Sequence, residues 1–176
     1  MVRYRRNLVA GGTFFITATL ADRNSRALVD HIQALRNAIR ETRQRHPFAI
    51  DAIVILPDHV HVVMTLPEGD ANFSIRWSLI KRRFTNSISK AGVSIPRRGN
   101  DETAVWQRRF WEHTIRDEGD FKKHVDYIHF NPVKHGHVAR VDDWPHSSFH
   151  WFVRLGLLPK DWAGDMRQFE GRNFGE

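Results

Sequence analysis

Several stretches of the chain alternate apolar and polar residues, and longer stretches repeat apolar residues every three or four positions. Period two is typical of a strand with one buried face, and the longer period is typical of an amphipathic helix. The pattern predicts strands within 8–20, 48–56, 59–66 and 110–115, and helices over 28–46, 73–88 and 117–131. A short helix is also predicted over 147–155.

A few residues predict where these elements begin and end. Pro47 follows the first long helix, and Asn72 could cap the second. A turn signal at 57–58 joins two adjacent strands into a hairpin. Proline disfavours helical backbone at the residue before it, so we expect the third helix to end near Asn131, before Pro132.

The predicted order is β-α-β-β-α-β followed by a further helix, which is the split βαβ, ferredoxin-like pattern. We therefore expect an α+β fold in which an antiparallel sheet carries helices on one face, plus a C-terminal helical extension. A length of 176 residues favours one domain. We place that domain at 1–155 and a C-terminal extension or tail at 156–176.

Composition excludes several classes of protein. The chain has no cysteine, which excludes a disulfide-stapled scaffold, a thiolate zinc site and a cysteine nucleophile. No run of eighteen apolar residues is present, so we expect no membrane span. We expect a soluble, cytoplasmic protein.

Positive charge is concentrated in one segment. Lys plus Arg exceed Asp plus Glu by 27 to 20, and residues 76–109 contain nine basic residues against two acidic ones. Because this segment accounts for the whole excess of +7, we expect it to contact a nucleic-acid backbone. The predicted phosphate contacts are Arg76, Lys81, Arg82, Arg83, Arg97, Arg98, Arg108 and Arg109, with Trp106 and Trp111 stacking on unpaired bases.

Two histidines on one predicted strand are candidate metal ligands. His59 and His61 stand two residues apart, so both imidazoles project from the same face, opposite Val60 and Val62. Two neutral imidazoles at this spacing can share a metal ion, although a polar strand face without metal also explains them. Without cysteine, magnesium, manganese and zinc are all compatible with the remaining ligand types.

Tyr127 is one of two tyrosines and lies in the third predicted helix, with Asn131 one turn further on the same face. A tyrosyl oxygen can be a nucleophile, and a metal can polarise the phosphate that it attacks. Asn131 could offer its amide oxygen to that metal. A tyrosine at the edge of the core is the simpler interpretation of this residue alone.

Other histidines carry weaker signals. His124 and His129 flank the tyrosine, and we expect His129 to make a structural hydrogen bond. Spacing assigns no role to His113, His135, His137, His146 and His150, for which we expect solvated or capping positions.

Two motifs together resemble a known family. The stretch ILPDHVHVV at 55–63 resembles the His-hydrophobic-His motif of single-tyrosine HUH transposases, the IS200/IS605-like type that acts on single-stranded DNA. The stretch DYIHFNPVK at 126–134 resembles the catalytic-tyrosine helix of one branch, the REP-associated tyrosine transposases. Stretches 77–84, 105–111 and 144–149 are also similar to that branch, so the resemblance covers roughly 8–155.

The resemblance implies that Tyr127 is the nucleophile and that His59, His61 and Asn131 hold Mg²⁺ or Mn²⁺. It implies attack on a DNA phosphate that leaves a 5′-phosphotyrosine and a free 3′-hydroxyl. The implied partner is single-stranded or hairpin DNA such as a REP element, bound by a monomer in the bacterial cytoplasm and nucleoid. Insertion-sequence relatives build each site from two chains and often carry Gln where Asn131 stands.

Two alternatives stay open at this point. A metal nuclease could use His59 and His61 to activate water, with Tyr127 in a structural role. A basic protein of this fold could also bind hairpin DNA without catalysis. The presence of all three residues argues against a degenerate enzyme.

Overall fold

The computed structural model describes residues 7–94, 97–98, 102–103, 105–164 and 174–175. A four-stranded sheet has the order β2-β3-β1-β6, and each neighbouring pair is antiparallel. Its strands are β1 (Thr13–Thr19), β2 (Ala49–Ile55), β3 (His59–Thr65) and β6 (Trp111–Thr114). A separate two-stranded ribbon pairs β4 (Arg97–Arg98) with β5 (Glu102–Thr103). The predicted α+β fold with a ferredoxin-like antiparallel sheet is confirmed.

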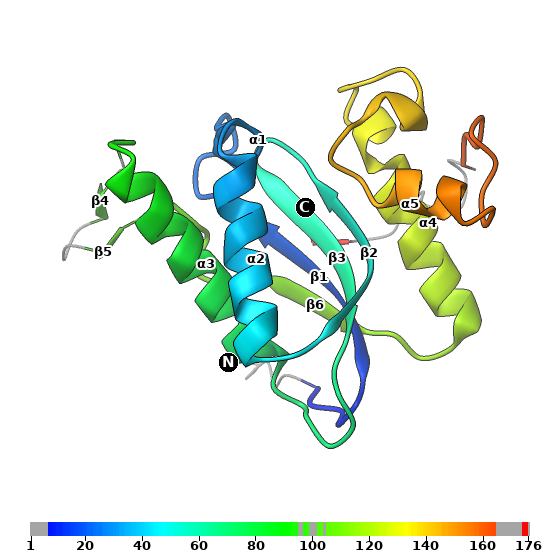
Figure 1. Ribbon diagram of the computed structural model, residues 1–176, viewed down its shortest axis with the longest axis horizontal. Helices are drawn as coiled ribbons and strands as arrows, with labels where there is room; N and C mark the ends of the chain where they lie inside the picture. The colour runs from blue at the N-terminus through cyan, green and yellow to red at the C-terminus, as the bar shows by residue number, and fades with distance from the viewer. Residues whose placement is uncertain (1–6, 95–96, 99–101, 104, 165–173, 176) are drawn as a thin grey trace, which may run out of the picture.

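Helices α1 (Ala27–Asp30), α2 (Ile32–Arg45) and α3 (Phe73–Lys90) cover one face of the sheet (Figure 1). The first predicted helix is interrupted at His31 but ends before Pro47, as expected. Asn72 caps α3, because its side-chain oxygen accepts a hydrogen bond from the Ile75 amide at 3.1 Å. Val60 and Val62 of β3 pack in this first core, so the alternating pattern determines which side chains face these helices.

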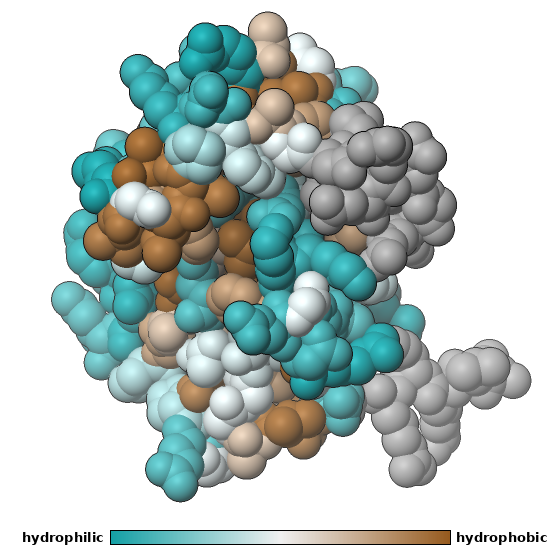
Figure 2. Space-filling model, turned by 90° about the vertical axis from the view of Figure 1, so that its right-hand side faces the viewer, coloured by the Kyte–Doolittle hydropathy of each residue, from teal (hydrophilic) through white to brown (hydrophobic). Residues whose placement is uncertain are grey.

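Helix α4 (Glu118–Lys134), the short 3-10 helix η1 (Val141–Asp143) and α5 (Phe149–Arg154) form the C-terminal helical part (Figure 1). They pack on the other side of the sheet, where Phe15 and Val63 meet Ile128 in a second core. Figure 2 views the molecule from the right of Figure 1 and shows brown hydrophobic surface among hydrophilic residues. No helix in the described part of the chain is both long and apolar enough to span a bilayer.

Helix α4 does not end at Asn131, so that prediction is wrong. The helix continues through Pro132 to Lys134, and the amide of His135 donates to the carbonyl of Asn131 at 3.0 Å. Proline removes one helical hydrogen bond, but here Pro132 is buried with its helix against the sheet. Packing therefore outweighs the local preference, and Lys134 comes two turns after Tyr127 on the same helix.

Candidate active site

The register between β1 and β3 positions the two candidate histidines. His61 pairs with Thr17 and His59 pairs with Thr19, and both imidazoles project toward the side covered by α4. Both residues are almost fully buried, with 1% of His59 and 0% of His61 exposed, and their ring centroids lie 4.8 Å apart. The two rings therefore share a face, as their spacing predicts.

Helix α4 brings the tyrosine to the same place. The ring of Tyr127 lies 5.3 Å from that of His61, centroid to centroid, and only 1% of the tyrosine is exposed. Asn131 is fully buried one turn further along α4. Residues separated by more than sixty positions in the chain thus form one cluster of two imidazoles and a phenol.

A hydroxyl group fixes the tautomer of His61. Thr17 donates its one hydroxyl hydrogen to the carbonyl oxygen of Phe174 at 2.6 Å. It must then accept at its 2.8 Å contact with Nδ1 of His61, so Nδ1 carries the imidazole proton. The lone pair of His61 consequently lies on Nε2, which is the nitrogen that can act as a metal ligand in this tautomer.

A carboxylate holds His59 in a corresponding way. Nδ1 of His59 lies 2.8 Å from one carboxylate oxygen of Asp58, and the other oxygen accepts from Arg23. Burial alone would raise the pKa of Asp58, but the hydrogen bonds and charges of His59 and Arg23 outweigh it and lower the pKa to about 2. An ionised Asp58 therefore accepts from Nδ1–H of His59. Such outer hydrogen bonds orient metal-binding imidazoles, so this donor set fits a divalent cation.

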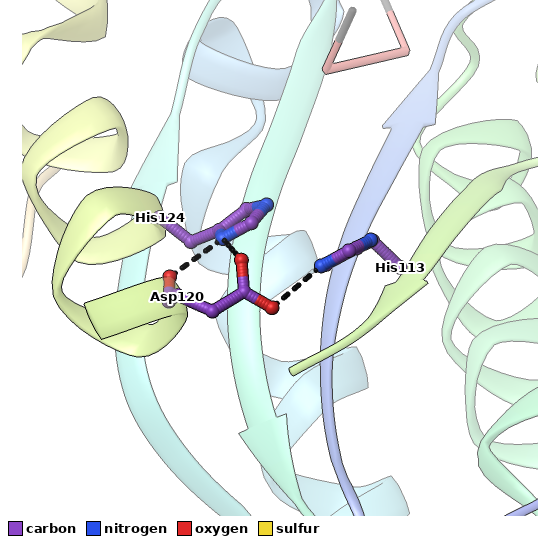
Figure 3. A group of neighbouring side chains, drawn as sticks. All are labelled: His113, Asp120 and His124. Atoms are coloured by element: carbon purple, nitrogen blue, oxygen red, sulfur yellow. Dashed lines mark hydrogen bonds and ion pairs between the residues drawn. The ribbon is translucent and has the colours of Figure 1, made fainter. Parts of the chain in front are cut away.

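A second group of histidines surrounds Asp120 (Figure 3). Nε2 of His113 lies 2.8 Å from one carboxylate oxygen, and Nδ1 of His124 lies 3.2 Å from the other. The ligand atoms are close enough for a metal, but Nδ1 of His124 also contacts the Asp120 main-chain carbonyl at 2.8 Å. The two rings are nearly parallel, at 17° with centroids 4.7 Å apart, whereas a metal lies near the plane of each imidazole that binds it.

This geometry fits hydrogen bonds around an ionised carboxylate better than a metal site. Burial opposes ionisation of Asp120, but hydrogen bonds from His113 and the Arg116 amide lower its pKa. The group joins β6 to the first turn of α4, and so helps to position the tyrosine helix. Spacing along the sequence did not reveal it, because the three residues come from two elements.

Two further residues approach the cluster, and sequence reasoning missed both. Nζ of Lys134 donates a hydrogen bond to the phenolic oxygen of Tyr127 at 2.9 Å and lies 5.0 Å from its ring centroid. The ring of His135 lies 5.2 Å from that of His59. The sequence did contain a signal for Lys134. If the helix is taken to continue past Pro132, Lys134 comes seven residues, or about two turns, after Tyr127 and lies on nearly the same face.

The end of the chain also reaches the site. Phe174 lies in the segment predicted to be a tail, yet its ring stacks on Tyr127 with centroids 3.7 Å apart and an angle of 12°. It is buried in the second core. In this conformation Phe174 covers the phenol ring.

The structure contradicts two of the predicted DNA contacts. Arg76 is only 1% exposed, and its guanidinium donates to Asp70 and to the carbonyls of Pro47 and Asn72. It ties the start of α3 to the chain before β2, and its donors are turned inward. Trp106 is buried in the first core. Neither side chain can reach a DNA backbone or an unpaired base without leaving the core.

The other predicted contacts are more exposed. Arg82, Arg108 and Arg109 are exposed, whereas Arg83 is 3.5 Å from Glu41 and Lys81 donates to the Gln107 carbonyl. Trp111 is half-buried beside His113. The side chains of Arg97 and Arg98 lie outside the described residues. Helix α3 covers one face of the sheet and Tyr127 lies on the other face. Strand β6 forms one edge of the sheet, between these two faces.

Comparison with known proteins identifies the family. Residues 15–131 match the family model described as Transposase IS200 like. The chain is 47% identical to the REP-associated tyrosine transposase of Escherichia coli strain K12, over 96% of this chain and 95% of that protein. A Haemophilus influenzae protein is 46% identical over 94% of this chain and 95% of its own length. A solved structure of a REP-associated tyrosine transposase bound to a REP hairpin matches with a TM-score of 0.88 and 46% identity, covering 100% of this chain and 98% of that one. The chain therefore belongs to the IS200-like transposase family, in its branch of REP-associated tyrosine transposases.

Proposed function

We propose that this protein is a metal-dependent single-stranded DNA endonuclease and strand transferase that acts on hairpin DNA through Tyr127. The observation that carries the proposal is the buried cluster in which Tyr127 lies 5.3 Å from His61, and His61 lies 4.8 Å from His59, between ring centroids. The REP hairpin bound by the similar solved protein supports hairpin DNA as the substrate. Because one chain supplies all three side chains, the cluster also supports a monomeric enzyme.

The metal ligands in this proposal are Nε2 of His59, Nε2 of His61 and the amide oxygen of Asn131. Imidazole nitrogen and amide oxygen suit Mg²⁺ or Mn²⁺, with water completing the coordination. All three ligands are neutral, so they would not offset the positive charge of the cation. When bound, such a cation polarises the scissile phosphate and neutralises charge that develops there.

The reaction is a transesterification. The phenolic oxygen of Tyr127 forms a bond to phosphorus while the bond from phosphorus to the 3′ oxygen breaks. The products are a 5′-phosphotyrosine and a free 3′-hydroxyl. Because the phosphodiester bond is exchanged and not hydrolysed, a 3′-hydroxyl can reverse the step and join strands without ATP.

DNA must reach a tyrosine that is buried. Phe174 stacks on the phenol ring of Tyr127, and only 1% of the tyrosine is exposed. We propose that the Phe174 ring moves aside when DNA binds. Arg108 and Arg109 are exposed just before the edge strand β6, and Arg82 is exposed on α3. We propose that the DNA backbone follows these arginines around the β6 edge to the face that carries Tyr127.

A covalent-adduct assay tests the proposal. The substrate is a DNA hairpin with a single-stranded extension that carries one label at its 5′ end and a second label within the strand. It is incubated with the protein and Mn²⁺ or Mg²⁺, and the products are run on a denaturing gel. We expect a protein–DNA band that Tyr127→Phe abolishes without loss of hairpin binding, while Tyr4→Phe keeps it. His59→Ala should also abolish the band while retaining binding.

The other outcomes identify the alternatives. A band that persists in Tyr127→Phe refutes the assignment of the nucleophile. Cleavage without a covalent band indicates attack by water, and binding without cleavage by the parent protein indicates a non-catalytic DNA-binding protein.

A further inference from the structure

Lys134 contacts the reacting oxygen of the proposed nucleophile. Its ammonium donates to the phenolic oxygen of Tyr127 at 2.9 Å, and it lies 5.0 Å from the centre of the phenol ring. A lysine ammonium has three donor hydrogens and no acceptor, so the phenolic oxygen must be the acceptor in this bond. A full positive charge therefore lies against the atom that would attack phosphorus.

Both residues come from α4, which makes the contact a property of one rigid element. Lys134 follows Tyr127 by seven residues, or about two helical turns. The contact exists because α4 continues through Pro132, and the buried cluster of Tyr127 with His61 fixes the phenol from the other side. Lys134 itself is exposed at the C-terminal end of α4.

We propose that Lys134 is a catalytic residue that binds both the attacking oxygen of Tyr127 and a non-bridging oxygen of the scissile phosphate. The inference rests on the proposed function. In a near-attack geometry, the nucleophilic oxygen stands roughly 3–3.5 Å from the reacting atom. An ammonium carries three donor hydrogens, so one that lies 2.9 Å from the phenolic oxygen could also donate to an oxygen of a phosphate held there. Metal and lysine would stabilise the transition state from two sides.

The lysine would act in both directions of the reaction without gaining or losing a proton. In cleavage, the oxygen–phosphorus bond to Tyr127 forms, the bond to the 3′ oxygen breaks, the phenolic proton passes to water, and the 3′ oxygen takes a proton from water. In joining, the phenolic oxygen leaves phosphorus, and the ammonium stabilises its developing negative charge. Loss of Lys134 should therefore slow cleavage and joining alike.

Three substitutions test this role. Lys134→Gln removes the charge, Lys134→Arg keeps it, and Lys123→Gln removes the same charge from an exposed position on the same helix. The measured quantities are the single-turnover rate of adduct formation at saturating hairpin DNA with Mn²⁺, the rate of rejoining from isolated adduct, and the Kd for the hairpin. Thermal unfolding checks that each variant is folded.

We expect Lys134→Gln to lower both rates about 10²- to 10³-fold, as removal of one preorganised donor to a transition-state oxygen does, with Kd changed less than about threefold. Lys134→Arg should recover most of the rate, and Lys123→Gln should match the parent. If Lys134→Gln fails to fold, Lys134→Met and Lys134→Arg provide the uncharged and charged pair.

The failure of this inference differs from the failure of the proposed function. Adduct that forms equally fast in the parent and in the uncharged variant overturns the role of Lys134 alone. A loss that appears wholly in Kd also overturns it, because Lys134 would then only bind DNA. No adduct in the parent or in any variant overturns the proposed function and this inference with it.

Discussion

His129 should make the protein less stable in mild acid. It lies on α4 two residues after Tyr127, is fully buried, and its Nε2 is 3.0 Å from the hydroxyl oxygen of Ser148. That hydroxyl accepts from the Ile53 amide at 2.9 Å and can donate its hydrogen to His129. Burial, reinforced by the charge of His150, lowers the pKa of His129 from 6.5 to about 3.

The sign and the size of the effect follow from this pKa. Between about pH 6.5 and pH 3 the unfolded chain binds a proton at His129 and the folded protein does not. The free energy of unfolding therefore falls as the pH falls through this window, by up to about 1.4 kcal/mol per pH unit. From pH 7 to pH 5 the loss from His129 is about 2 kcal/mol, and above pH 7 the contribution is constant.

Urea unfolding at pH 7 and pH 5, followed by circular dichroism, measures this loss in the parent and in His129→Gln. Glutamine keeps a polar partner for Ser148 but does not ionise. His137 and His146 also have pKa values lowered by burial, so both proteins lose some stability in acid. We expect the parent to lose about 2 kcal/mol more than the variant. Equal losses in the two proteins would refute the reasoning.

Other substitutions separate structural from surface roles. Arg76→Met should lower the free energy of unfolding by about 2–3 kcal/mol, because buried acceptors lose their donor. The control Arg82→Met, at an exposed position, should change it by less than about 0.5 kcal/mol. Similar urea midpoints for the two variants would contradict this expectation. Asn72→Ala should cost about 1 kcal/mol through loss of the α3 cap, again by urea unfolding. Phe174→Ala should speed nitration of Tyr127 by tetranitromethane, located by peptide mass spectrometry, and an unchanged rate would show that the ring does not cover Tyr127 in solution.

Local sequence patterns determined the elements and their order. Alternation along β3 placed Val60 and Val62 in one core and turned His59 and His61 to the opposite face. Asn72 and Pro47 marked helix ends because capping and proline geometry depend only on adjacent residues. The same local reasoning failed at Pro132, since burial of α4 against the sheet outweighs the loss of one helical hydrogen bond.

The tertiary structure alone decided what surrounds each side chain. Arg76 and Trp106 resembled DNA contacts in a basic segment, yet packing of distant segments buries both. Phe174 reaches Tyr127 across 47 positions of the chain, and Lys134 reaches it because α4 extends past a proline. Periodicity reports which face a residue occupies on its own element. The neighbours across that face depend on how the elements pack together, which short-range patterns do not specify.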